Sequence, residues 1–240
     1  MNRAWLLSLM LQLPACSPAG TPEQTREEMV RRQIAGREVR DARVLEAMKA
    51  VPRHEFVPAE LRGRAYEDGP LPIGHGQTIS KPSVVARMIE LLMGGVIARQ
   101  TRSLGRVLEI GTGCGYQAAV LALLAKQVVS IERLRPLHDK ARALLAPRRP
   151  ANMRLVYGDG MLGHAPNAPY DSIVAAAGGD ALPEAWLEQL AVGGRLVSPV
   201  REAGSQRQVL MVVDRTEQGF ERHVHEAVHF VPLKSGMVAG

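Results

Sequence analysis

The feature that most constrains this chain is a glycine-rich turn that joins an apolar run to a helical pattern. Val107–Ile110 predicts a buried strand, and Gln117–Leu124 predicts a helix. Three glycines lie in the turn between them: Gly111, Gly113 and Gly115. Glycines permit positive φ and let a ligand lie against bare backbone, and the start of the following helix offers unpaired N–H donors. The turn therefore predicts a nucleotide-like ligand at the end of a strand.

From Arg106 onward, short apolar runs alternate with helical patterns, which is typical of a mostly parallel sheet covered by helices. Seven strands are expected: Val107–Ile110, Val128–Ile131, Met153–Tyr157, Ser172–Ala176, Arg195–Val200, Val209–Val213 and Ala227–Val231. Only Asp214–Arg222 separates the last two, which leaves no room for a helix, so they should pair antiparallel. The predicted fold class is α/β, a Rossmann-like, mostly parallel sheet with an antiparallel strand and with helices on both faces.

The N-terminal third predicts a layer of helices and loops in front of the sheet. Thr25 and Glu28 have the spacing of a capping box, and Asp41 precedes a second apolar stripe of helical period. The stretch from Pro52 to Gly76 is dotted with proline and glycine, so no regular element is expected there. A third helix is then predicted over Pro82–Met93.

The spacing of the glycines distinguishes between nucleotide-like ligands. A dinucleotide-binding turn has the pattern G-x-G-x-x-G, whereas here the glycines occur at every second residue and Tyr116 occupies the place of the third glycine. The pattern E-x-G-x-G-x-G favours S-adenosylmethionine, which has no phosphate. Glu109, at the end of the strand, could lie near the cationic amino-acid portion of that cofactor. A nicotinamide cofactor is the disfavoured alternative.

Two further acids follow the next strands. Glu132 can accept hydrogen bonds from both ribose hydroxyls, and Asp159 can accept one from the adenine amino group. A helix cap at Glu132 and a plain turn at Asp159 are the structural alternatives. Because ligands of open α/β sheets bind at the carboxyl ends of the strands, these positions should meet at one site. The expected cofactor-binding residues are Glu109, Gly111, Gly113, Gly115, Glu132, Asp159 and Gly160.

The charge distribution argues against nucleic acid as a partner. Lysine and arginine exceed aspartate and glutamate by 30 to 24, which gives a net charge of +6. The densest basic pieces are Arg31-Arg32 and Arg148-Arg149, and no aromatic residues alternate with them. Aromatic residues make up only 4% of the chain, too few for a base-stacking surface. The basic excess is therefore interpreted as a scattered, solubilising charge.

Cysteines and histidines give no basis for a metal site. Cys16 and Cys114 are far apart in the sequence, which is not the pattern of a disulfide framework or a zinc site. His223, His225 and His229 would share one face of an extended strand, but no carboxylate or cysteine joins them at ligand spacing. No metal is expected.

One segment around residues 72–82 carries a resemblance to a known family. Pro72-Ile73-Gly74-His75-Gly76-Gln77-Thr78-Ile79-Ser80-Lys81-Pro82 closely resembles the active-site segment of protein-L-isoaspartate O-methyltransferases, P-I-G-x-G-Q-T-I-S-x-P. The resemblance extends over nearly all of residues 28–236. Other matching segments are Arg53–Pro58, the glycine turn, Gly158–Gly160, Leu187–Val197 and Phe230–Leu233.

This resemblance implies methyl esterification of L-isoaspartyl carboxylates in damaged proteins, with S-adenosylmethionine as donor and repair through a succinimide. It identifies Ser80 with the family's active-site serine, which would aim the acceptor carboxylate while Gln77 and Thr78 shape the pocket. The acceptor is ionised at neutral pH, so no general base is required. Without the family, Ser80 just ahead of Pro82 is equally well explained as a helix cap.

Two other functions remain open. The same fold could methylate a small molecule or RNA, since the fold does not fix the acceptor. A catalytically silent protein that binds S-adenosylmethionine is the alternative from another class. The expected partners are proteins or peptides with isoaspartyl residues, and the chain is expected to be a monomer.

The length of 240 residues suits one α/β domain, which we expect over residues 23–240. Residues 1–22 predict an apolar leader and linker, with a basic start and an apolar stretch too short to span a bilayer. They predict either an export signal, with a lipid anchor at Cys16, or an apolar tail or misassigned start. Because the cofactor is made in the cytosol, we expect a cytoplasmic enzyme.

Overall fold

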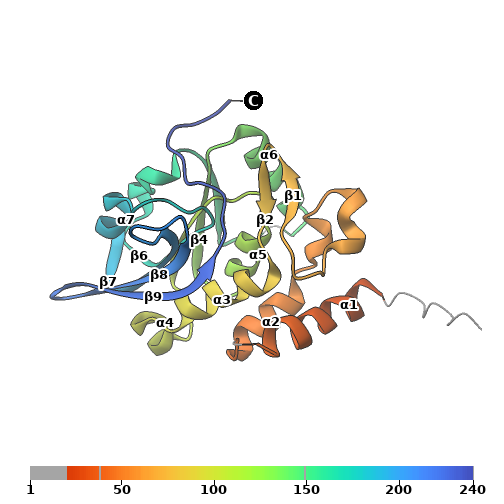
Figure 1. The fold of residues 1–240 in the computed structure, drawn as a ribbon, viewed down its shortest axis with the longest axis horizontal. Helices are drawn as coiled ribbons and strands as arrows, with labels where there is room; N and C mark the ends of the chain where they lie inside the picture. Colours follow the sequence, from red (N-terminus) through yellow and green to blue (C-terminus); the bar gives the residue numbers. More distant parts are fainter. Residues whose placement is uncertain (1–20, 38, 149, 240) are drawn as a thin grey trace, which may run out of the picture.

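The fold is built on a seven-stranded sheet with the strand order β5-β4-β3-β6-β7-β8-β9 (Figure 1). The computed structural model describes residues 21–37, 39–148 and 150–239. Residues 1–20 of the predicted leader and linker, Cys16 among them, therefore lie outside the described residues. The strands of this sheet are β3 Arg106–Ile110, β4 Gln127–Glu132, β5 Met153–Tyr157, β6 Tyr170–Ala175, β7 Leu190–Arg201, β8 Gln208–Thr216 and β9 Gly219–Val228.

Only β8 runs against its neighbours in this sheet, because β3 to β7 pair in parallel and β8 pairs antiparallel with both β7 and β9. The predicted α/β class, with seven strands and one antiparallel strand, is therefore confirmed. The order places β3 between β4 and β6: from β3 the chain adds β4 and β5 on one side, and it then adds β6 on the other side of β3. Loops at the carboxyl end of such a strand separate and leave room for a ligand.

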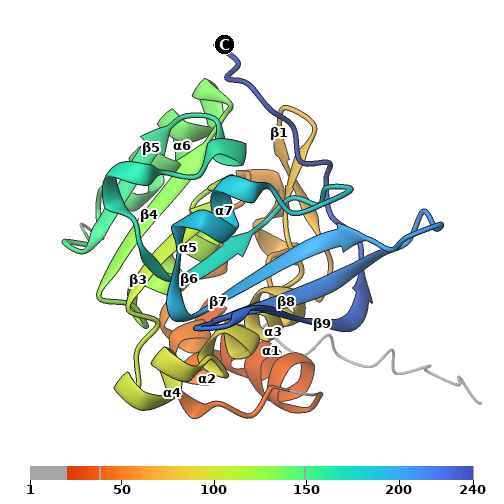
Figure 2. The ribbon, with the colours of Figure 1, turned by 90° about the vertical axis from the view of Figure 1, so that its left-hand side faces the viewer.

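Helices cover both faces of the sheet. One face packs against α3 and α5, and the other face packs against α7, whose Trp186 is completely buried (Figure 2). The α-helices are α1 Pro22–Met29, α2 Ala42–Ala50, α3 Pro82–Met93, α4 Val96–Thr101, α5 Tyr116–Ala122, α6 Arg135–Leu145 and α7 Glu184–Gln189. The shorter helical turns are η1 Val30–Ala35, η2 Arg53–Glu55, η3 Ala59–Arg64, η4 Gly160–Leu162 and η5 Ala165–Asn167. Of these helices, none is long and apolar enough to cross a membrane in the part of the chain that the structure describes.

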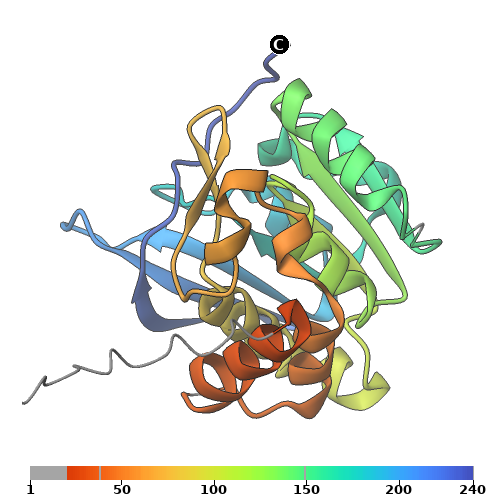
Figure 3. The same ribbon diagram turned by 90° about the vertical axis from the view of Figure 1, so that its right-hand side faces the viewer.

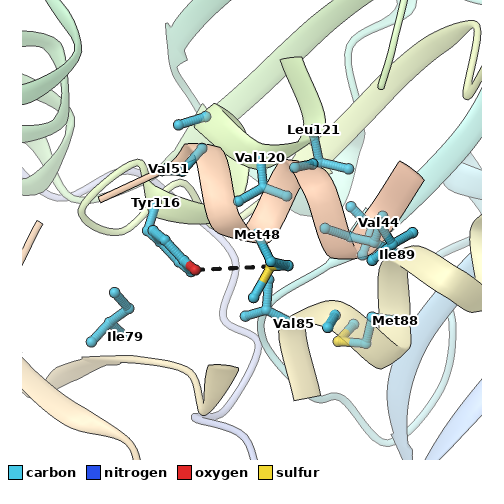
Figure 4. Close-up of a cluster of buried hydrophobic side chains, with 14 of the residues drawn as sticks. Val44, Met48, Val51, Ile79, Val85, Met88, Ile89, Tyr116, Val120 and Leu121 are labelled. Carbon is cyan, nitrogen blue, oxygen red and sulfur yellow. Dashed lines mark hydrogen bonds between the residues drawn. The ribbon is translucent and has the colours of Figure 1, made fainter. Parts of the chain in front are cut away.

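A hydrophobic cluster fixes the N-terminal helices against the start of α5 (Figure 4). Met48 of α2 and Val85 of α3 lie next to each other at the hydroxyl end of Tyr116, whose hydroxyl donates to Met48 Sδ at 3.8 Å. The guanidinium of Arg53 lies over the Tyr116 ring, 5.1 Å from its centre. The N-terminal layer therefore holds the first residue of α5, directly after the glycine turn.

The first helix begins four residues earlier than the predicted capping box. Thr21 is its N-cap, and the backbone N–H and side chain of Thr21 exchange hydrogen bonds with Gln24. Thr25 is inside the helix, where its hydroxyl donates to the Thr21 carbonyl. The box predicted at Thr25 was wrong because Pro22, with its fixed φ, takes the first helical position. The cap predicted at Asp41 is confirmed, since its side chain accepts from Arg43 N.

The proline- and glycine-rich stretch is more ordered than predicted. It contains η2, η3 and strand β1 Leu71–Gly74, which pairs antiparallel with β2 Gln77–Ile79 to form a separate hairpin. Gly74, His75 and Gly76 adopt positive φ angles of 100°, 53° and 68°, and this left-handed run reverses the chain within the turn. The prediction of no regular element was wrong because the hairpin is held by packing on the sheet domain rather than by strand propensity.

The last strand also differs from its prediction. Strand β9 occupies Gly219–Val228, so it begins eight residues and ends three residues before the predicted Ala227–Val231. Most of its side chains are exposed at the edge of the sheet, so it lacks the apolar run that marks the inner strands. After β9 the chain leaves the sheet and runs beside the β1–β2 hairpin (Figures 1 and 3).

Candidate active site

A cavity of about 300 Å³ lies at the carboxyl ends of the central strands, within the usual range for small-molecule sites. The glycine turn forms its floor, the hairpin with Ser80 forms one wall, and the tail after β9 forms another. The residues that line it are His75, Gln77–Ser80, Val85, Ile110–Cys114, Tyr116, Gln117, Ile131–Leu134, Gly160, Ala176, Ala177 and Val231–Lys234.

The glycine turn adopts the backbone that its composition predicts. Gly111, Gly113 and Gly115 have φ angles of 90°, 56° and 89°. Gly111 N donates to the Ile131 carbonyl at 2.8 Å, which ties the turn to the end of β4. Gly111 and Gly113 line the cavity. Gly115 lies outside its lining, and a Cβ at this position would be 2.9 Å from Leu145 Cδ1 of α6, so this glycine makes room for a helix.

Glu132 supports the start of α6, as the structural alternative predicts, and it also lines the cavity. Its carboxylate accepts hydrogen bonds from Gly113 N and Leu134 N, both at 2.9 Å, so it supports the glycine turn and the start of α6. Glu132 is 5% exposed and lines the cavity. A carboxylate that is fixed by two N–H donors retains lone pairs for further donors, such as vicinal hydroxyl groups.

Asp159 and Gly160 follow β5, and of the two only Gly160 lines the cavity. The Asp159 carboxylate accepts from Met161 N at 2.9 Å and from Gly236 N at 2.6 Å, and so ties the C-terminal tail to this strand end. Gly160 lines the cavity, and its carbonyl accepts from Trp186 Nε1 at 2.8 Å. A Cβ on Gly160 would lie 2.6 Å from Ile110 Cγ2, so only glycine fits between the two strand ends.

Glu109 is completely buried beneath the glycine turn and is outside the lining of the cavity. Ser130 Oγ donates to Glu109 Oε2 at 2.5 Å, and Thr112 Oγ1 lies 2.6 Å from Ser130 Oγ. Burial raises the pKa of the Glu109 carboxyl to about 8, against the opposing effect of the hydrogen bond from Ser130. The structure thus separates this acid from the cavity by one layer of side chains.

The three acceptor-side residues predicted from the sequence lie together on the cavity wall. Gln77 and Thr78 are in β2, and Ser80 follows it. The N-cap of α3 is Lys81, and no side chain makes a capping hydrogen bond there. The interpretation of Ser80 as a helix cap is therefore wrong, because the helix begins one residue too late for it. Ser80 lines the cavity and makes no capping hydrogen bond to α3.

Several lining residues were not predicted from the sequence. Thr112, Cys114 and Gln117 come from the glycine turn and α5, and Leu233 and Lys234 come from the tail. Their positions next to the glycine pattern could have indicated the first three. No local pattern marks the tail, since its place in the wall depends on the path of the chain after β9.

The donor set fits a nucleoside with an amino-acid chain. The cavity offers bare backbone at the glycine turn, an acid at Glu132, apolar walls such as Ile110 and Ile131, and a buried Gln117 Nε2 without a partner. Across residues 21–37, 39–148 and 150–239, no three histidine, cysteine or acidic side chains are grouped so that they could hold a metal ion.

Comparison with known protein families agrees with this geometry. Residues 24–238 match the family model described as Protein-L-isoaspartate(D-aspartate) O-methyltransferase. A protein-L-isoaspartate O-methyltransferase of Methylibium petroleiphilum is 63% identical over 212 residues, which are 88% of this chain and 77% of that protein. One of Burkholderia ambifaria is 56% identical over 230 residues, 94% of this chain and 72% of that protein.

Solved structures of similar fold carry the same name. A protein-L-isoaspartate O-methyltransferase superimposes with a TM-score of 0.75 at 27% identity, over 90% of this chain and 67% of that one. A putative enzyme of that name from Plasmodium falciparum, in complex with S-adenosyl-L-homocysteine, gives a TM-score of 0.74 at 23% identity, over 90% and 99% of the two chains. At 23% identity, the similarity to the Plasmodium falciparum protein shows a shared fold.

Proposed function

The chain belongs to the protein-L-isoaspartate(D-aspartate) O-methyltransferase family, and from this premise we propose how its residues carry out the reaction. It transfers a methyl group from S-adenosylmethionine to the free carboxylate of isoaspartyl residues in damaged proteins and peptides. The methyl ester then closes to a succinimide without the enzyme, and hydrolysis of the succinimide can return normal aspartate. The enzyme is therefore a carboxyl methyltransferase that begins protein repair.

The chemistry requires orientation more than acid or base catalysis. S-adenosylmethionine, when bound, would supply a methyl group on a sulfonium: an ionised carboxylate oxygen would bond to the methyl carbon as the carbon–sulfur bond breaks, and S-adenosylhomocysteine would leave. A carboxylate with a pKa near 4 is ionised at neutral pH, so the protein need not remove a proton. The remaining task of this chain is to hold the acceptor in line and to exclude water.

The acceptor side is assigned to the hairpin wall. Ser80 donates a hydrogen bond that aims the carboxylate, and Gln77 and Thr78 shape the pocket beside it. The support for this assignment is that all three line the cavity and that Ser80 does not cap α3. Ser80 acts as an orienting group and forms no covalent bond to the substrate.

The cofactor side is assigned to the glycine turn and the ends of β4 and β5. Gly111, Gly113 and Gly160 offer close backbone approach, and Glu132 accepts from the ribose hydroxyls. Asp159 is placed at the adenine end, where its carboxylate also holds Gly236 N. Glu109 and Gly115 are assigned supporting roles behind the cavity wall, the first by holding Ser130 next to Thr112 of the lining and the second by admitting α6.

The observation that carries the proposal is the single cavity that joins the glycine turn to Ser80. The test is a methanol-release assay with S-adenosylmethionine and two peptides that differ only in an isoaspartyl or aspartyl residue. We expect release from the isoaspartyl peptide alone. Cofactor binding without release would indicate a silent binding protein, and label transfer to RNA or a small molecule instead would indicate another acceptor.

Three further expectations remain part of this proposal. We propose one catalytic domain over residues 23–240 that acts as a monomer, which light scattering at assay concentration tests. We propose a cytoplasmic location, because the cofactor is made there, with export or lipid anchoring at Cys16 as the alternative. Mass spectrometry of the mature N-terminus distinguishes these locations.

A further inference from the structure

Arg53 is a fully buried cation that the described reaction does not use. It begins the short turn η2, ahead of the acceptor hairpin, and its exposed fraction is 0%. Its Nε donates to the Ala65 carbonyl at 2.8 Å, and Nη2 donates to the Gly69 carbonyl at 3.4 Å. Nη1 is buried without a hydrogen-bond partner. The hydrogen bonds of this cation therefore go to neutral carbonyl groups.

The charge of Arg53 has no acidic partner in the described part of the chain, where no carboxylate forms an ion pair with it. Asp68, whose charge acts on Arg53, forms its ion pair with Arg37 Nη1 at 3.0 Å and accepts hydrogen bonds from Ser83. Burial lowers the pKa of Arg53, but an arginine side chain stays protonated in proteins. A buried, unpaired charge is costly, so an anion nearby would stabilise it.

The guanidinium of Arg53 lies one side chain behind the wall of the cavity. It is over the ring of Tyr116, 5.1 Å from the ring centre, and Tyr116 lines the cavity. Tyr116 belongs to the same buried cluster as Ile79 and Val85, which line the cavity as well (Figure 4). Because Ile79 directly precedes Ser80, this is the acceptor side of the wall. A charge in such a poorly polar surrounding acts over several ångströms.

We propose that Arg53 is a specificity-determining residue whose positive charge favours an ionised carboxylate at the acceptor side of the cavity. The effect is electrostatic, so it requires no contact between Arg53 and the peptide. This inference rests on the proposed function, because it takes an isoaspartyl peptide as the acceptor. It also favours substrate over product, since methylation removes the negative charge that Arg53 attracts.

The test compares two peptides that differ in one charge. One carries an isoaspartyl residue, with a free carboxylate, and the other an isoasparaginyl residue, with a neutral amide at that place. Isothermal titration uses protein saturated with S-adenosylhomocysteine, so that no methyl group is transferred. Arg53→Met should bind the isoaspartyl peptide about tenfold more weakly than the wild type and the isoasparaginyl peptide equally well. Equal binding of both peptides by the wild type would overturn the proposal without any variant.

Arg53→Lys separates the charge from the shape of the side chain. The titration is made at pH 6, where the isoaspartyl carboxylate is ionised and a buried lysine holds its proton more readily than at higher pH. This variant should keep most of the preference for the isoaspartyl peptide, although one ammonium group cannot match the fork of a guanidinium. Loss of the preference in Arg53→Lys as in Arg53→Met would assign it to the hydrogen bonds with Ala65 and Gly69 and overturn the proposal.

Steady-state kinetics gives a second readout. The carboxylate loses its charge during the reaction, so Arg53 should stabilise the bound substrate more than the transition state. Arg53→Met should therefore raise the peptide KM about tenfold and change kcat less, and a fall in kcat at unchanged KM would contradict the proposal. Arg215→Met is the matched control. Arg215 also donates to a carbonyl, that of Glu188 at 3.2 Å, and lies 5.7 Å from the centre of the Phe220 ring, but outside the cavity lining.

The cofactor is the other source of a carboxylate. S-adenosylhomocysteine and its decarboxylated analogue, S-adenosyl-3-thiopropylamine, differ only in this group. Arg53→Met should bind each of them as the wild type does. A selective loss for S-adenosylhomocysteine, with the peptide preference intact, would assign the charge of Arg53 to the cofactor and overturn its role at the acceptor.

This inference and the proposed function fail in different ways. If the wild type releases no methanol from the isoaspartyl peptide, both are overturned. If it releases methanol and Arg53→Met keeps the preference for the isoaspartyl peptide, only the inference is overturned. Circular dichroism and the melting temperature of each variant establish that folded proteins are compared.

Discussion

The cofactor side of the cavity comes from one contiguous stretch, residues 106–160, whereas the acceptor side joins a hairpin at residues 71–79 to a tail at residues 231–234. The first is held by parallel pairing of β3, β4 and β5 and by backbone bonds within the glycine turn. The second is held by side chains of the hairpin that pack into the hydrophobic core, Leu71, Ile73 and Ile79, and by the hydrogen bond from Lys140 Nζ to the Ile73 carbonyl at 3.0 Å. The comparison indicates a rigid binding floor and an acceptor wall that depends on long-range packing.

The largest effect should come from the buried acid on the cofactor side. The unfolded chain titrates Glu109 near 4.5 and the folded chain near 8, so between these values the folded state holds an extra proton. Raising the pH across this window favours unfolding, by about 5 kcal/mol at about 1.4 kcal/mol per pKa unit. Glu109→Gln should remove this decline.

Urea denaturation at pH 5 and pH 8 measures the decline for both proteins. Glu60→Gln, which changes an exposed acid in η3, is the control and should keep the wild-type pH dependence. A wild-type stability that does not fall between these pH values would show that the Glu109 carboxyl is ionised in the folded state.

On the acceptor side, Ser80→Ala should lower kcat about 100-fold, the scale of losing one well-placed donor to the reacting group. The free energy of unfolding should hardly change, because Ser80 makes no capping bond to α3. Steady-state kinetics with an isoaspartyl peptide and thermal unfolding measure the two effects.

The neighbouring Ser83 provides a matched control for Ser80. Ser83 Oγ donates to Asp68 Oδ2 at 2.9 Å, away from the cavity. Ser83→Ala should therefore cost about 1 kcal/mol of stability and leave turnover intact. If Ser80→Ala kept full turnover in a folded protein, the assignment of Ser80 as the orienting group would be lost.

Gly113→Ala tests the contact between the two sides. Gly113 has a φ of 56°, and its Cβ would lie 3.2 Å from Ile73 Cδ1 of the hairpin. We expect a loss of about 1–2 kcal/mol in stability from the left-handed backbone, with a larger rise in KM for the peptide than in Kd for the cofactor product. Gly63→Ala is the control, because its Cβ would meet no atom within 4 Å. Equal rises in the peptide KM and in the Kd of the cofactor product would indicate that the glycine turn and the hairpin respond to the substitution as one unit.

The smallest effect should come from the bond between α6 and the hairpin. Lys140→Met removes the donor to the Ile73 carbonyl while it keeps the length of the side chain. The loss should be about 1 kcal/mol or less, seen as a two- to threefold rise in peptide KM. Lys49→Met, which removes an exposed pair with Glu46 in α2, should leave KM unchanged. A fall in cofactor affinity with an unchanged peptide KM would contradict the assignment of Lys140 to the acceptor side.

Local chemistry was sufficient for much of the fold. Helix α3 over Pro82–Met93 and strand β5 over Met153–Tyr157 have their predicted bounds, and Asp41 caps α2 as expected. Each of these follows from signals within a few residues: apolar periodicity, a proline at the first helical position, or a capping side chain. The antiparallel pairing of β8 and β9 was also predicted, although β9 was placed too late.

The sequence by itself determined the glycine turn, the acids that follow the strands and the segment around Ser80, because these depend on the chemistry of neighbouring residues. Only the tertiary structure decided which of them face the cavity. It placed Glu109, Gly115 and Asp159 outside the lining of the cavity, showed that Ser80 does not cap α3, and brought Gln117 and the tail to the site. The reason is that burial and contact are set by elements far apart along the chain, as when α6 packs on Gly115 or the tail crosses beside the hairpin.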